Sequence, residues 1–144
     1  MPLAAHGLID TGAIVAIVES DDEWHFPCLE ALRSLRLPLL TTEAVLTEAF
    51  HLIGRNSRKI DEAWNFIRSG GILLQPTNDS DLPRLRALMA QYADRPMDFA
   101  DATLVHLAER ESLSLILSVD HDDFETYRLP GRKKFTILPK RLQE

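Results

Sequence analysis

Four acidic residues stand where carboxylates from distant parts of the chain could act together. Asp10 follows "HGLI" and Asp120 follows "SLILSV", so each comes directly after a run typical of a short strand. In an open sheet of parallel strands, functional side chains gather where the strands end. The simpler interpretation of either residue is a cap at the start of the next helix.

The other two, Glu48 and Asp101, interrupt apolar helix faces. Glu48 lies within the predicted inward stripe of its helix, which consists of Val45, Ala49, Leu52 and Ile53. Asp101 follows Asp98 by three residues and precedes Val105 by four. A buried lone carboxylate is costly, so it is usually paired or bound to a metal. Glu48 and Asp101 therefore either line a shared site or lie at the edge of the stripe, in contact with solvent.

Four converging carboxylates would repel one another and raise one another's pKa values unless a cation neutralised them. The set offers only oxygen ligands, with no Cys or His at ligand spacing, which suits Mg²⁺ or Mn²⁺. Such an ion polarises a phosphoryl oxygen and activates water for in-line attack. The expected chemistry is metal-dependent hydrolysis of a nucleic acid.

The predicted elements that position these residues alternate between strands and helices, which indicates an α/β fold in three layers (α/β/α). We expect a central parallel sheet of four to five strands and one domain over residues 1–144. The strands are predicted at 6–9, 37–40, 72–76, 113–120 and 134–138. Helices are predicted at 22–38, 42–54, 57–71, 80–96 and 98–112, with a turn or short helix at 122–127. Residues 11–20 fit either a strand or a helix, and Leu82, Leu85, Leu88 and Met89 are expected to face inward.

Composition restricts the partners and the compartment. The net charge of −6 argues against binding nucleic acid through the whole surface, so any such contact must come from local basic clusters. The candidates are Arg55, Arg58 and Lys59, and Arg132, Lys133 and Lys134, although a solvated surface is an equally good interpretation. The single cysteine, Cys28, and the absence of a signal-peptide pattern predict a cytoplasmic protein with no membrane span.

Four segments together resemble the PIN-domain family, and most closely its VapC-type toxins from toxin–antitoxin pairs. The segments are "LIDTGAIVAIVE", "LLTTEAVLTEAFHLI", "MDFADATLVHLAER" and "LILSVDHDDF", in that order. The resemblance implies that Asp10, Glu48, Asp101 and Asp120 bind one or two Mg²⁺ or Mn²⁺ ions and are catalytic. Thr11 and Ser118 match supporting positions, Gly12 is expected to form a tight turn, and Asp98 either joins the metal ligands or, as we favour, caps its helix.

The resemblance implies an endoribonuclease that forms a homodimer and is neutralised by a small antitoxin. One alternative is a PIN nuclease of RNA processing that has no antitoxin. A receiver-type or other non-nuclease Mg²⁺-binding domain is more remote, because "GILLQPT" lacks the Asp that a receiver needs at the end of its third strand. An aspartic protease is disfavoured because Asp-Thr-Gly occurs once, before mostly helical segments, and the complete acidic set argues against a non-catalytic binding module.

Overall fold

A five-stranded parallel sheet lies at the centre of the computed structural model, which describes residues 5–142. Its strands run in the order β3-β2-β1-β4-β7. Their bounds are β1 Gly7–Ile9, β2 Leu39–Thr42, β3 Ile72–Gln75, β4 Leu115–Leu117 and β7 Thr136–Leu138. The expected parallel sheet is confirmed, whereas the ends of the predicted domain, residues 1–4 and 143–144, lie outside the described residues.

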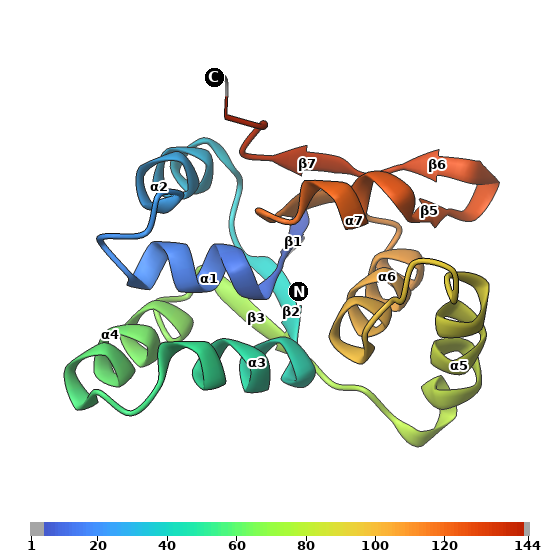
Figure 1. Ribbon diagram of the computed structural model, residues 1–144, viewed down its shortest axis with the longest axis horizontal. Helices are drawn as coiled ribbons and strands as arrows, with labels where there is room; N and C mark the ends of the chain where they lie inside the picture. Colours follow the sequence, from blue (N-terminus) through green and yellow to red (C-terminus); the bar gives the residue numbers. More distant parts are fainter. Residues whose placement is uncertain (1–4, 143–144) are drawn as a thin grey trace.

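Seven α-helices within the described residues complete the three layers. They are α1 Thr11–Val18, α2 His25–Ser34, α3 Glu43–Ile53, α4 Ser57–Ile67, α5 Leu82–Gln91, α6 Phe99–Glu111 and α7 His121–Thr126, and a short 3₁₀ helix, η1 Asp79–Asp81, precedes α5. In Figure 1, α1 and α2 lie on one side of β1, and α5 and α6 lie on the other. Helix α3 packs against both α1 and α6, so it reaches both helical layers.

The segment that fitted either a strand or a helix forms α1. Asp10 caps it by accepting a hydrogen bond from the Thr11 amide, and the helix buries Ala13, Ile14 and Ala16. Ile and Val favour strands only weakly, and packing overrides that preference. Because α1 contacts α2, α3 and α4, apolar residues are accommodated on several of its sides.

Three predicted inward residues are exposed instead. Leu52 is 58% exposed, because α3 buries only the narrower stripe of Val45, Ala49 and Ile53. Leu82 and Met89 are 46% and 36% exposed, because α5 buries only Leu85 and Leu88 within its sequence. Each helix therefore buries a narrower face than the sequence pattern indicated.

The last predicted strand, 134–138, is divided in two. Its first residue belongs to β6 (Lys133–Lys134), which pairs antiparallel with β5 (Arg128–Leu129). A second 3₁₀ turn, η2 (Pro130–Arg132), connects these two strands into a hairpin. Only Thr136–Leu138 joins the main sheet, as β7, and the buried Phe135 lies between the two strands. No helix within residues 5–142 combines the length and apolar character needed to cross a membrane.

The register of the sheet places the ends of β1 and β4 side by side. Leu8 pairs with Ile116 and Ile9 with Leu117, and the Asp10 amide donates to the Leu117 carbonyl at 3.0 Å. Asp10 and Ser118 are therefore neighbours, each directly after its strand. Strand pairing alone thus brings two distant parts of the chain together.

Candidate metal centre

Asp10 is a buried carboxylate held by two donors. Its Oδ1 accepts a 2.7 Å hydrogen bond from the Thr11 amide, and its Oδ2 accepts one of 3.0 Å from the Ser118 hydroxyl. The side chain is only 5% exposed, and this burial raises its pKa to about 7 despite both donors. The nearby charges of Asp120 and Glu48 raise the pKa further. Positive charge in the site would therefore favour the ionised form of Asp10.

Ser118 links the first carboxylate to the last. Its hydroxyl donates to Asp10 and accepts a 3.0 Å hydrogen bond from the Asp120 amide. Ser118 is fully buried, so this geometry is protected from water. Asp120 caps α7 and has a pKa raised to about 6, first by burial and then by Asp123.

Asp101 is the most strongly perturbed of the carboxylates. Burial, and then the charge of Asp10, raise its pKa to about 8. The hydroxyl of buried Tyr127 donates to its Oδ2 at 2.7 Å, which opposes that rise. Asp98 caps α6, as expected, by accepting a 2.8 Å hydrogen bond from the Asp101 amide, and its alternative role as a metal ligand stays a prediction.

Glu48 approaches the site from α3. It is half-buried, and burial together with the charge of Asp98 raises its pKa. The Thr11 hydroxyl donates to the Val45 carbonyl at 3.3 Å, so Thr11 joins the start of α1 to the helix that carries Glu48. In this way Thr11 contributes to the site through its hydroxyl as well as through its amide.

Gly12 allows close packing rather than a tight turn. A Cβ atom at this position would lie 2.5 Å from Cγ2 of Val119, well inside contact distance. Val119 precedes Asp120, so Gly12 lets α1 approach the segment that carries the last carboxylate. The expectation of a tight turn was wrong, because Gly12 lies within the regular helix α1.

These side chains line one pocket of about 330 Å³ at the carboxyl ends of the strands. Its walls are Asp10, Thr11, Gly12, Glu48, Leu52, Asp98, Asp101, Val119 and Asp120. The structure thus brings together all four predicted carboxylates and Asp98. Oxygen-only donors that are difficult to ionise together fit a hard divalent cation such as Mg²⁺ or Mn²⁺.

Asp123 and Tyr127 are site residues that sequence reasoning missed. One carboxylate oxygen from each of Asp101, Asp120 and Asp123 lies within 4.8 Å of the others, close enough to share an ion. The sequence interpretation placed Asp123 in the turn or short helix at 122–127 and gave it no function. The spacing of Asp120, Asp123 and Tyr127 at i, i+3 and i+7 on one helical face was the signal available.

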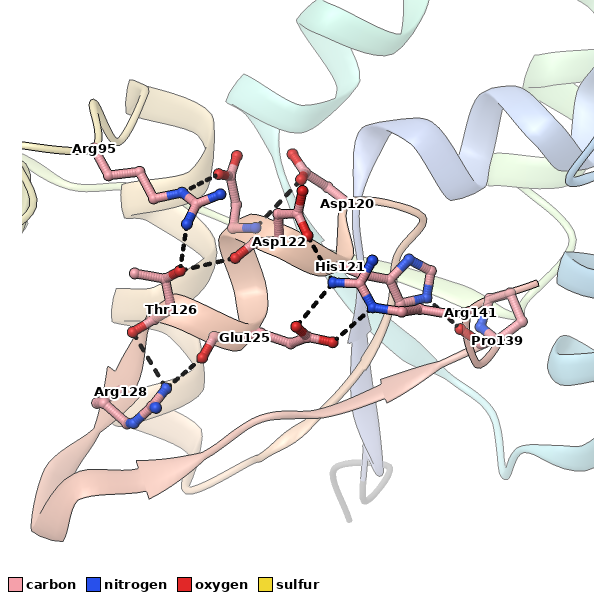
Figure 2. Close-up of polar contacts among 10 residues, drawn as sticks. Arg95, Asp120, His121, Asp122, Glu125, Thr126, Arg128, Pro139 and Arg141 are labelled. Carbon is pink, nitrogen blue, oxygen red and sulfur yellow. Dashed lines mark hydrogen bonds and ion pairs between the residues drawn. The ribbon is translucent and has the colours of Figure 1, made fainter. Parts of the chain in front are cut away.

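Helix α7, which carries Asp120 and Asp123, is fixed from two sides (Figure 2). Arg95 donates to the Asp123 carboxylate at 3.3 Å and to the Thr126 hydroxyl at 3.0 Å. Arg141 pairs with Asp122 at 2.6 Å and with Glu125 at 2.9 Å. These contacts restrain the helix without using Asp120.

The two predicted basic clusters lie outside this pocket. Lys59 pairs with Glu19 at 2.8 Å and Arg58 with Glu62 at 3.3 Å, whereas Arg55 lies in the exposed link between α3 and α4. Arg132, Lys133 and Lys134 occupy the exposed η2–β6 end of the hairpin. None of the six lines the acidic pocket, so a contact with nucleic acid through them remains a prediction.

The fold and the pocket define an α/β protein with an acidic, oxygen-only site at the carboxyl ends of parallel strands. The chain belongs to the PIN domain family, whose model matches residues 7–129. Ribonuclease VapC26 of Mycobacterium tuberculosis is 25% identical over 135 residues, which cover 92% of this chain and 99% of that protein.

Two solved structures share the fold. The first is VapC20 of Mycobacterium tuberculosis, described as a sarcin-ricin loop cleaving toxin. It has a TM-score of 0.73 and 18% identity, over 81% of this chain and 91% of its own. VapBC2 of Rickettsia felis, bound to a promoter DNA fragment, has a TM-score of 0.64 and 12% identity, over 91% of this chain and 97% of its own.

Proposed function

We propose that this chain is a Mg²⁺- or Mn²⁺-dependent endoribonuclease of the VapC type, formed by one PIN domain over residues 1–144, and the toxin of a toxin–antitoxin pair. The observation that carries the proposal is the pocket shared by Asp10, Glu48, Asp101 and Asp120. The pKa values of Asp10 and Asp101, about 7 and about 8, mean that these carboxyls ionise fully near neutral pH only beside a cation. The name of the 25% identical relative, Ribonuclease VapC26, supports RNA as the substrate.

Asp10, Glu48, Asp101 and Asp120 would hold the ion or ions, with Asp123 as a further ligand. A bound divalent cation would lower the pKa of the attacking water and would neutralise the charge that develops on the phosphate. The protein's own part is positioning. Ser118 fixes Asp10 relative to Asp120, Tyr127 fixes one oxygen of Asp101, and Thr11 ties α1 to α3. No covalent intermediate with the enzyme is needed.

We extend the proposal to the partners and the location. The chain is expected to form a homodimer and to be blocked by a small antitoxin. The VapBC2 structure, one chain of which shares this fold, supports an antitoxin partner. An RNA substrate agrees with a cytoplasmic location, and the two basic clusters would add contacts to phosphate.

Asp10→Asn tests the chemistry, because it removes the charge and keeps the shape. Cleavage of single-stranded RNA with Mn²⁺ should fall by about 100-fold or more, as it should with chelator. Asp61→Asn, a matched change at an exposed position on α4, should cleave normally. Cleavage that survives both chelator and Asp10→Asn contradicts the metal-nuclease assignment.

The toxin assignment has its own test. Expression of the chain alone should arrest growth, and co-expression of a short open reading frame from directly upstream should restore it. Normal growth, with no such reading frame, would favour a nuclease of RNA processing.

A further inference from the structure

A second and larger cavity adjoins the acidic pocket. It measures about 790 Å³ and shares Glu48 and Asp98 with that pocket, so the two cavities lie next to each other. The remaining walls come from Thr77, from Glu43, Ala44, Thr47 and His51 along α3, and from Phe99 and Ala100 at the start of α6. A molecule whose phosphate lies at the carboxylates would therefore extend into this cavity.

The cavity combines an aromatic wall with acceptor groups. Phe99 is 46% exposed at the start of α6 and forms part of the wall of this cavity, so its ring is accessible to a ligand there. Glu43 is exposed at the start of α3, and its ionised carboxylate can only accept hydrogen bonds. The Thr47 hydroxyl donates its proton to the Glu43 carbonyl at 3.0 Å, so toward the cavity it too acts as an acceptor.

These walls select one part of an RNA strand. Glu43 is not among the proposed metal ligands, so no bound ion offsets its charge, which disfavours a backbone phosphate beside it. A nucleobase is uncharged and flat, and single-stranded RNA is recognised by stacking such bases on aromatic side chains. A carboxylate accepts best from two adjacent donors, which guanine presents at N1–H and the exocyclic N2 amine.

We propose that this cavity binds the base of the nucleotide next to the scissile phosphate, and that it prefers guanine. The base stacks on Phe99, and the Glu43 carboxylate accepts from its Watson–Crick edge. The inference rests on the proposed ribonuclease function and adds a specificity determinant to it. Phe99 and Glu43 thus set which phosphodiester reaches the carboxylates.

Cleavage of a random pool of short single-stranded RNAs with Mn²⁺, followed by sequencing of the new ends, tests this subsite. The wild-type chain should enrich guanine on one side of the cut. Phe99→Ala should lower kcat/KM by about 5- to 100-fold, mainly through KM, because it removes one stacked base. Glu43→Gln should flatten the guanine preference more than it slows cleavage of the pool.

Phe26→Ala and Glu30→Gln are matched controls, since both residues are exposed on α2 and line neither cavity. Both should retain the wild-type rate and end profile. If Phe99→Ala and Glu43→Gln also retain them, the subsite is overturned while the ribonuclease function stands. If Phe99→Ala instead splits a dimer in sedimentation and loses activity in parallel, the cavity is an interface and the subsite is overturned. No cleavage by the wild type overturns the function and, with it, the subsite.

Discussion

At the scale of single residues, the hydroxyl of Tyr127 directly affects the pKa of Asp101, a predicted metal ligand. It donates to Asp101, whose pKa burial has already raised to about 8. A donor to the ionised carboxylate stabilises that form, so the hydroxyl keeps the pKa lower than burial alone would set it. Tyr127 is therefore a positioning residue for Asp101.

Tyr127→Phe should move the acid limb of the pH–rate profile to higher pH by about one unit. The reason is that a hydrogen bond to a charged group contributes about 1.5–3 kcal/mol, and one pKa unit corresponds to about 1.4 kcal/mol. The measurement is kcat/KM against pH at one fixed Mn²⁺ concentration below saturation, at which protonation of Asp101 still competes with the ion.

Tyr92→Phe is the control for that substitution. The Tyr92 hydroxyl accepts a 2.8 Å hydrogen bond from the Arg128 amide, and its ring contacts that of Tyr127 edge-on. Its removal should lower stability and leave the acid limb in place. An acid limb that is equally displaced in both variants would contradict the function we give Tyr127.

Residue types and spacing were enough to select the carboxylates that meet in the pocket, although their function there stays a prediction. They were not enough to identify Asp123, because α7 carries three acids besides its cap Asp120, namely Asp122, Asp123 and Glu125. Which of them faces the site depends on the exact rotation of α7. Arg95 and Arg141 restrain that rotation, and both reach α7 from distant parts of the sequence.

At the scale of elements, the approach of α1 to the segment after β4 determines how far apart Asp10 and Asp120 lie. Gly12 makes the approach possible, because a Cβ there would meet Val119 at 2.5 Å. In an exposed helix, Gly→Ala stabilises by about 1 kcal/mol. At Gly12 the contact with Val119 should make the same substitution destabilising.

Gly12→Ala should destabilise the fold by roughly 1–3 kcal/mol and weaken Mn²⁺ binding, because overpacking forces the two segments apart. Denaturant unfolding and a Mn²⁺ titration measure the two effects. Val119→Ala in the same chain should restore part of both, since it removes the atom that clashes. A Gly12→Ala variant as stable as the wild type would show that the packing is looser than described.

The helix α1 also marks the limit of prediction for elements. The sequence of residues 11–20 suits either a strand or a helix, and only the packing of α1 against three other helices decides between them. The same dependence on packing explains why Leu52 is exposed, although the sequence pattern predicts that it faces inward. A helical stripe identifies the inward side, but the depth of burial depends on the neighbouring helix.

At the scale of the whole molecule, the acidic pocket should make stability depend on pH. The pKa values of Asp10 and Asp101 in the folded protein, about 7 and about 8, lie above the ordinary 3.8. The folded state thus binds more protons than the unfolded state between about pH 4 and pH 8. Without metal, stability is highest at the acid side of this window and falls as pH rises through it.

Thermal unfolding in chelator should accordingly show a lower Tm at pH 8 than at pH 5. Mn²⁺ favours the ionised carboxylates, so it should raise Tm more at pH 8 than at pH 5. The double variant Asp10→Asn with Asp101→Asn should lose most of this pH dependence and gain little from Mn²⁺. A metal-free Tm that rises from pH 5 to pH 8 would contradict the raised pKa values.

The architecture as a whole was predictable because alternating strand and helix patterns leave few arrangements. The α/β class, the parallel sheet and the grouping of strand ends all follow from that alternation. The division of 134–138 between a hairpin and the sheet edge was not predictable, because both are extended and differ only in their partners.

The pairing of Ile9 with Leu117 has an evolutionary consequence. It places Asp10 beside Ser118 through backbone hydrogen bonds, which any two apolar residues would make equally well. The spacing of Asp10 and Ser118 is thus inherited with the sheet register, and apolar substitutions in β1 and β4 that preserve the packing leave it unchanged. Such substitutions can accumulate while this spacing persists, as expected for a fold shared with VapC20 at 18% identity.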